Sequence, residues 1–183
     1  MRENIRHLAW GIVFCSWSIT ISLFSTVVID FLPDIVGVVF FWRFLTAHGG
    51  RQPLHDRLCF GFAVLYAIGM IFPLYLRWPA AADAVFCWGS SAWMLCLLVL
   101  LRRCFALLER LTRDAGREDL AASARRFGRI LTVLYLVRTG LYLAGAAQTE
   151  EAMTLVWIGL NLLLAGFAAN CQTIAPKEAP AEA

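Results

Sequence analysis

Long apolar runs that carry almost no charge dominate the pattern of this chain. A helix rises 1.5 Å per residue, so crossing a hydrocarbon core of about 30 Å takes roughly 20 mainly apolar residues. Six runs of about this length or somewhat less predict six transmembrane helices, at 8–29, 35–47, 58–76, 84–101, 130–147 and 152–169. They form three antiparallel hairpins within a single all-α membrane domain, 1–174, and the polar tail, 175–183, is expected to be disordered.

The second helix is short, and its thirteen residues also suit a re-entrant segment. The positions of the arginines decide between the two topologies. With six crossings and a cytoplasmic N-terminus, Arg77 is the only arginine in the outer loops, whereas five crossings would place all eight arginines of 102–129 outside. The positive-inside rule therefore favours six crossings, with both termini in the cytoplasm and the chain in the bacterial inner membrane.

Composition agrees with a membrane protein. Of the 183 residues, 60% are hydrophobic and 16% charged, with a mean hydropathy of +0.68. A soluble domain has about 45–50% apolar and about 25% charged residues, so a water-soluble enzyme, a disordered chain and a nucleic-acid-binding protein are excluded. The first run is also longer than the apolar core of a cleavable signal peptide, and no small-residue cleavage site follows it.

The long inner connection, 102–129, carries half of the chain's 16 basic residues. Its apolar residues recur at helical spacing, which predicts that the fourth and fifth helices extend into the cytoplasm as a basic hairpin broken at Gly116. Its eight arginines are Arg102, Arg103, Arg110, Arg113, Arg117, Arg125, Arg126 and Arg129. Two interpretations stay open: contact with anionic lipid headgroups that also fixes the topology, or docking of a cytoplasmic protein.

Arg138 is the one charged residue near the middle of a predicted span, the ninth of eighteen residues. A central arginine costs about 2.5–3.5 kcal/mol to insert, so it is expected to face protein or a wet cavity. Counting from a turn near Thr149 places Asn161 at almost the same depth. The candidate midplane cluster is Arg138, Asn161, Tyr142, Ser90, Ser91, Ser18 and Ser22. It either binds an anionic or carbonyl-bearing ligand, or consists of a structural arginine and serines that let helices pack closely.

Other chemistry is not indicated. The six cysteines form no C-x-x-C pair, and the three histidines all lie on the inner side, so neither a metal nor a cofactor is expected. The predicted spans contain no Ser–His pair and no aspartate dyad, and we expect no enzymatic activity.

The stretch 28–37, which reads VIDFLPDIVG, contains an L-P-D-x-x-G motif. It resembles the first hairpin of small bacterial multi-span integral membrane proteins, over about a quarter of the chain. The resemblance implies an inner-membrane protein of several spans and implies no particular chemistry. Where that pattern continues with Tyr, this chain has Val38.

Two functions are compatible with these features. The first is the handling or binding of a small solute, an anionic one included, by a transporter or by the membrane subunit of one, which needs a cavity that reaches Arg138. The second is an accessory or regulatory membrane protein that acts through the 102–129 arm, for which a dry interior around Arg138 suffices. In both, membrane lipids are partners and nucleic acid is not.

Overall fold

The computed structural model describes residues 2–15, 20–23, 27–30, 34–71, 79–144 and 147–171, with side chains at 5–15, 34–68, 88–141, 143–144 and 156–171. Within these ranges the chain forms six helices and one pair of short strands. In order they are α1 (Arg2–Phe14), β1 (Thr20–Leu23), β2 (Val27–Asp30), α2 (Asp34–Gly49), α3 (Leu54–Ile71), α4 (Pro79–Asp114), α5 (Glu118–Leu143) and α6 (Ala147–Asn170). The predicted helical class is confirmed.

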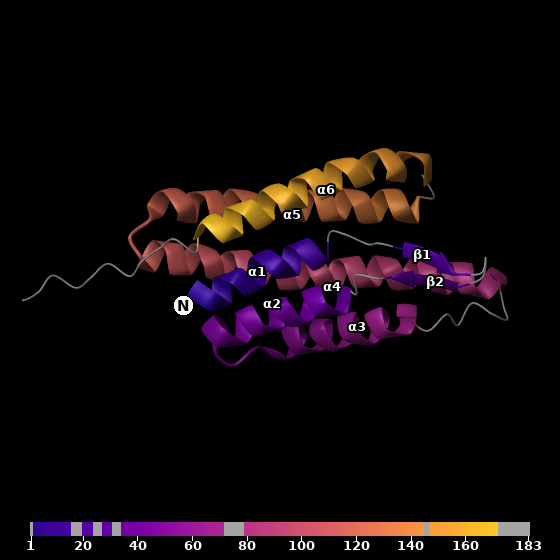
Figure 1. Cartoon of the computed structure of the whole chain (residues 1–183), viewed down its shortest axis with the longest axis horizontal. Helices are drawn as coiled ribbons and strands as arrows, with labels where there is room; N and C mark the ends of the chain where they lie inside the picture. Colours follow the sequence, from indigo (N-terminus) through magenta and orange to yellow (C-terminus); the bar gives the residue numbers. More distant parts are fainter. Residues whose placement is uncertain are drawn as a thin grey trace, which may run out of the picture.

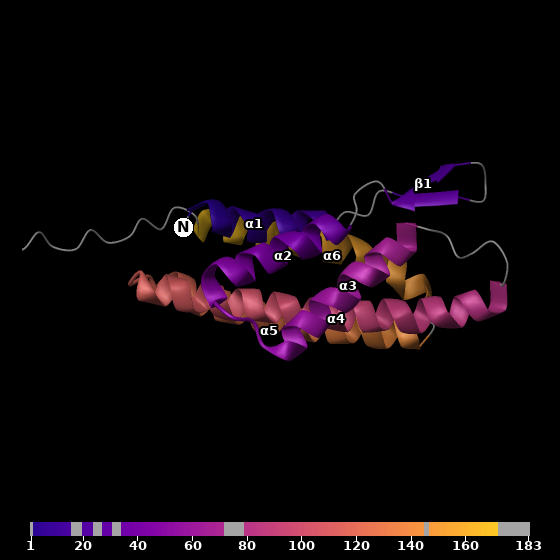
Figure 2. The same cartoon turned by 90° about the horizontal axis from the view of Figure 1, so that it is seen from below.

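The helices lie lengthwise in an elongated bundle (Figure 1). Each packs on the next in sequence, α6 packs back on α1, and α2 also contacts α4. The start of α1, the α2–α3 connection, the α4–α5 turn and the end of α6 all lie toward one end, as Figures 1 and 2 both show. This is the arrangement that three antiparallel hairpins require.

The first predicted span is wrong over its second half. A helix was expected across 8–29, but α1 begins at Arg2 and ends at Phe14, and β1 and β2 then pair antiparallel, with Thr20 opposite Asp30 and Leu23 opposite Val27. The strands are rich in β-branched residues, which lose rotamer freedom in a helix and favour extended backbone. Hydropathy alone does not distinguish the two, because both structures bury apolar side chains.

Two glycines bring α1 and α2 together. A Cβ atom at Gly11 would lie 2.6 Å from the ring of Phe41, and one at Gly37 would lie 2.8 Å from the carbonyl oxygen of Gly11 and collide with the sulfur of Cys15. Gly37 is the glycine of the L-P-D-x-x-G motif. Its role here is to let the backbones of α1 and α2 cross closely.

The predicted continuation of the fourth and fifth helices through 102–129 as a helical hairpin is confirmed. α4 runs unbroken for 36 residues, about 54 Å at 1.5 Å per residue, and α5 runs for 26. The turn between them is a Schellman motif: Gly116, at φ 73°, donates its N–H to Arg113 O over 2.8 Å, and Arg117 donates to Thr112 O over 2.9 Å. Gly116 therefore ends α4 as expected.

Several other boundaries differ from the predictions, among them the start of α4 at Pro79 instead of residue 84 and the end of α5 at Leu143 instead of residue 147. An outer turn was expected at 148–151, but α6 already begins at Ala147, so these residues are helical. α3 begins at Leu54 instead of residue 58, because Pro53 precedes it and Asp56 sits favourably in its first turn. The predicted end of that span, residue 76, lies outside the described residues.

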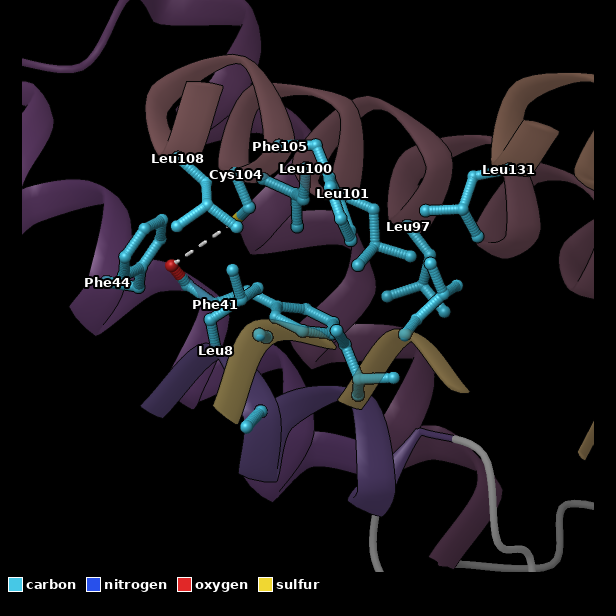
Figure 3. Close-up of a cluster of buried hydrophobic side chains, with 14 of the residues drawn as sticks. Leu8, Phe41, Phe44, Leu97, Leu100, Leu101, Cys104, Phe105, Leu108 and Leu131 are labelled. Carbon is cyan, nitrogen blue, oxygen red and sulfur yellow. Dashed lines mark hydrogen bonds between the residues drawn. The ribbon is translucent and has the colours of Figure 1, made fainter. Parts of the chain in front are cut away.

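The core lies along one stripe of α4 (Figure 3). Buried residues recur on that stripe at helical spacing and meet residues of α1, α2 and α5. The side chains labelled there are Leu8, Phe41, Phe44, Leu97, Leu100, Leu101, Cys104, Phe105, Leu108 and Leu131, all at most 3% exposed. The thiol of Cys104 also approaches the carbonyl oxygen of Phe41 at 3.9 Å.

By length and composition, one helix in the described part of the chain is able to cross a membrane, the part of α4 from Trp88 to Asp114. Two shorter apolar helices cover Ile5–Phe14 and Val156–Asn170. A buried core helix of a soluble protein meets the same criterion, so six crossings stay a prediction.

Candidate functional site

Arg138 lies on α5 with its side chain partly buried against α6. Its guanidinium carbon is 5.0 Å from the ring centroid of Trp157, a cation–π distance. Tyr135, one turn earlier, packs edge-on against the same indole, with ring centroids 4.4 Å apart at 72°. The arginine and the tyrosine therefore share one buried aromatic partner.

The direction of helical side chains explains this pairing. They lean toward the N-terminus of their own helix, so on antiparallel neighbours Arg138 leans away from the α5–α6 turn and Trp157 leans toward it. Asn161, which the depth argument paired with Arg138, lies one turn further along α6 and is 4% exposed. Among the described residues no hydrogen bond joins it to Arg138. Depth along the helices alone does not identify Trp157 as the partner of Arg138, because the pairing depends on these side-chain directions.

Ser90 belongs to a different contact. Its hydroxyl lies 2.6 Å from the hydroxyl of Tyr66 on α3, and Ser90 is 8% exposed. The neighbouring Ser91 is also buried. Ser90 thus serves the α3–α4 contact, whereas Arg138 serves the α5–α6 contact.

Three members of the predicted cluster are not described in full. Ser18 lies outside the described residues. Ser22 lies on β1 and Tyr142 near the end of α5, and the side chains of both lie outside the described residues.

The arm, residues 102–129, is held together by a carboxylate on α4. Glu109 Oε1 accepts hydrogen bonds from Arg113 on the same helix, over 2.6 Å, and from Arg125 on α5, over 2.7 and 2.9 Å. The hydrogen bonds from Arg125 hold the pKa of Glu109 below its ordinary value. Burial opposes them, while the charge of Arg125 and the hydrogen bond from Arg113 add smaller effects that lower the pKa further. Glu109 therefore ties the two helices of the arm together.

The eight arginines of the arm divide into two sets. Four form ion pairs: Arg113 and Arg125 with Glu109, Arg117 with Asp119 at 3.0 Å, and Arg103 with Asp56 at 3.0 Å. In the part of the chain that the structure describes, the other four are exposed and form no ion pair. They are Arg102, Arg110, Arg126 and Arg129.

Asp56 was not anticipated. Its side chain is 0% exposed in the first turn of α3, and its Oδ2 accepts a hydrogen bond from Arg103 Nε. His55 Nε2 lies 2.9 Å from Oδ1 without the geometry of a hydrogen bond. Asp56 and Arg103 are 47 residues apart, and no spacing rule connects them.

The solvent-facing side of α5 changes character within one turn. Arg125, Arg126 and Arg129 are exposed, and the same face continues with Ile130, 44% exposed, and Val133, 60% exposed. Along the arm, which the structure describes throughout, no large apolar side chain is exposed. Further exposed apolar residues on the bundle are Trp10, Val39, Leu54, Leu58, Phe62, Leu65, Ile68, Trp88, Leu95, Leu136, Val137, Leu143, Val156, Leu162 and Leu163.

Comparison with protein-family models, with curated proteins and with solved structures finds no match. Function therefore has to be argued from the arm, from Arg138 and from the exposed surface.

Proposed function

We propose that this chain is a polytopic inner-membrane protein with an accessory or regulatory role, which contacts the anionic cytoplasmic surface of the membrane through its arm. The observation that carries the proposal is the change of the exposed face of α5 at Arg129 and Ile130. Water around the arm and lipid around the rest of α5 explain that change. The boundary coincides with the start of the fifth span predicted from hydropathy, at residue 130.

The exposed apolar residues support a hydrocarbon environment. Val133 is 60% exposed, Leu136 51% and Leu163 67%. Monomeric soluble proteins rarely expose contiguous apolar patches larger than a few hundred Å², because each Å² left in water forgoes about 25 cal/mol. Lipid tails remove that cost.

The unpaired arginines support the surface contact. Each basic residue near an anionic leaflet contributes about 1 kcal/mol, provided that its charge is not already neutralised by an internal partner. Arg102 and Arg129 sit at the predicted boundary, with Arg126 one turn beyond Arg129. Arg113, Arg117 and Arg125 are committed to carboxylates within the arm.

The test is a matched pair of double variants in the full-length protein, reconstituted in nanodiscs. R126Q/R129Q removes two unpaired charges, and R113Q/R117Q removes two paired ones. Hydrogen exchange of the 102–129 peptides is compared between phosphatidylglycerol and phosphatidylcholine discs. We expect wild-type arm peptides to exchange more slowly in anionic discs, and R126Q/R129Q to lose most of that difference while R113Q/R117Q keeps it.

Two outcomes would contradict the proposal. Equal exchange in both lipids for the wild type would mean that the arm does not lie on the anionic surface, and a soluble protein partner would then be the better explanation for its charge. Recovery of the chain in the supernatant after alkaline carbonate extraction would remove the membrane location itself.

Solute handling is the second candidate, favoured by the partly buried guanidinium of Arg138 and by the buried Asn161 on the same helix as Trp157. A thermal-shift screen of the detergent-solubilised protein against inorganic phosphate and small mono- and dicarboxylates tests it, since a ligand that binds only the native state raises its stability. A stabilising anion whose effect is lost in a well-folded Arg138→Leu variant would favour transport or solute binding over the accessory role.

A further inference from the structure

A groove lies between α1 and α2. Its volume is about 530 Å³, within the range of small-molecule sites, and it is open on one side. Four residues of α1 and one of α2 line it: Arg6, His7, Trp10, Phe14 and Phe40.

Polar groups without partners gather at one end of this groove. His7 stacks on Phe40, with ring centroids 5.4 Å apart and planes 14° apart. Its Nδ1 atom is buried and has no hydrogen-bond partner among the described residues. Arg6 beside it is exposed and forms no ion pair in the described part of the chain. Arg6 therefore presents an exposed cationic group at this end of the groove, whereas His7 Nδ1 is enclosed by the protein and is not reached from the groove.

Aromatic rings form the rest of the groove. Trp10 and Phe14 lie 6.2 Å apart, and Phe14 and Phe40 lie 5.8 Å apart, measured between ring centroids. Trp10 is 47% exposed, so its indole forms an open apolar wall. From Arg6 to Phe14 the lining changes from cationic to aromatic over about 12 Å, at 1.5 Å per residue.

We propose that this groove binds one phospholipid with an anionic headgroup. The lipid phosphate takes hydrogen bonds from the exposed Arg6 guanidinium, and the first part of an acyl chain lies along Trp10, Phe14 and Phe40. The charge matches because an unpaired guanidinium binds phosphate oxygens well, and aromatic rings at a membrane interface suit the boundary between headgroup and tail. The inference rests on the membrane location proposed above but not on the arm.

The test counts lipids that stay bound. The full chain in phosphatidylglycerol–phosphatidylcholine micelles is analysed by native mass spectrometry, as wild type, Arg6→Gln, Trp10→Ala and the control Arg57→Gln. Arg57 is an exposed arginine on α3 that does not line the groove. We expect one retained phosphatidylglycerol on wild type and Arg57→Gln, roughly tenfold less on Arg6→Gln because a charge-assisted bond is lost, and less on Trp10→Ala.

Each alternative result overturns the proposal. Equal losses in Arg6→Gln and Arg57→Gln would mean unspecific attraction to the basic surface. Equal retention of phosphatidylcholine and phosphatidylglycerol would exclude recognition of the net negative headgroup. If inorganic phosphate alone displaced the lipid at equal concentration, or if Trp10→Ala kept full retention, the groove would be an anion site without an acyl part. Carbonate extraction, which tests the membrane location, is independent of all these readouts.

Discussion

The arm and the apolar half of the α4–α5 hairpin share their helices but not their surfaces. The buried seam continues across the boundary, with Leu100 and Leu101 on one side and Phe105 and Leu108 on the other. Only the exposed face differs, arginine at 125, 126 and 129 and apolar from Ile130 onward. The buried residues are apolar in both halves and therefore do not distinguish a lipid from an aqueous environment. The exposed residues differ between the halves and do distinguish the two environments.

The largest effect should come from placing a charge on the apolar half. Leu136→Arg puts a guanidinium on the exposed face near the middle of the predicted fifth span, where the proposed membrane location requires lipid, at a cost of about 2.5–3.5 kcal/mol. Ala122→Arg adds the same charge to an exposed position of the arm on the same helix and should be neutral. The measurement is the amount of full-length protein in the membrane fraction. Equal yields for the two variants would mean that both halves face the same solvent.

A smaller loss is expected where α3 meets the arm. Arg103→Gln leaves the fully buried carboxylate of Asp56 without its cation. Breaking a buried pair costs about 3–5 kcal/mol, and we expect roughly 2 kcal/mol here because the Arg103 side chain is 49% exposed.

Arg102→Gln is the control for Arg103→Gln, because Arg102 is exposed without an ion pair among the described residues. The free energy of unfolding of Arg102→Gln, measured in mixed micelles, should lie within about 0.5 kcal/mol of the wild-type value. If the two variants were equally stable, the Asp56–Arg103 pair would not hold α3 to the arm. The double variant D56N/R103Q should recover part of the loss.

The sequence predicted local structure better than pairing. The arginine-rich continuation of α4 and the break at Gly116 follow from helical spacing and from the conformational freedom of glycine, both properties of neighbouring residues. The β1–β2 pair was missed because mean hydropathy does not distinguish β-branched residues, which are frequent in the two strands, from other apolar residues. Length and charge predicted the six helices, but neither the strand pair nor every boundary.

Partners across the bundle needed the structure. Arg138 was identified from its depth alone, but Trp157 as its partner depends on the lean of two side chains on antiparallel helices. Asp56 and Arg103 meet because α3 crosses α4 at one particular angle, which no pattern in either helix encodes. The same holds for the groove, whose Phe40 comes from α2 and whose other lining residues come from α1.

Two glycines on opposite sides of the boundary should respond with opposite signs. Gly116→Ala forces a side chain into the left-handed region, at φ 73°, and should cost about 1 kcal/mol or somewhat more by loosening the arm's turn. Gly140→Ala lies inside α5 with open space around its Cβ and should stabilise by about 0.5–1 kcal/mol through helix propensity. Unfolding in mixed micelles measures both. Destabilisation of similar size in both would show that strain at the turn is not the cause.

The smallest expected effect is a pH dependence confined to the arm. The pKa of Glu109 is held below its ordinary value of 4.5, mainly by the hydrogen bonds from Arg125. A group whose pKa is lowered on folding adds stability that is fully present above the ordinary value and is lost as the pH falls from there through the lowered pKa. The free energy of unfolding of wild type should therefore exceed that of Glu109→Gln by roughly 0.5 kcal/mol at pH 7, a size typical of partly exposed ion pairs. At pH 3 the difference should be smaller. Unfolding followed by a probe in the arm at both pH values measures this. A difference that stayed constant with pH would mean that Glu109 acts by packing alone, and the link between the two arm helices would then not be electrostatic.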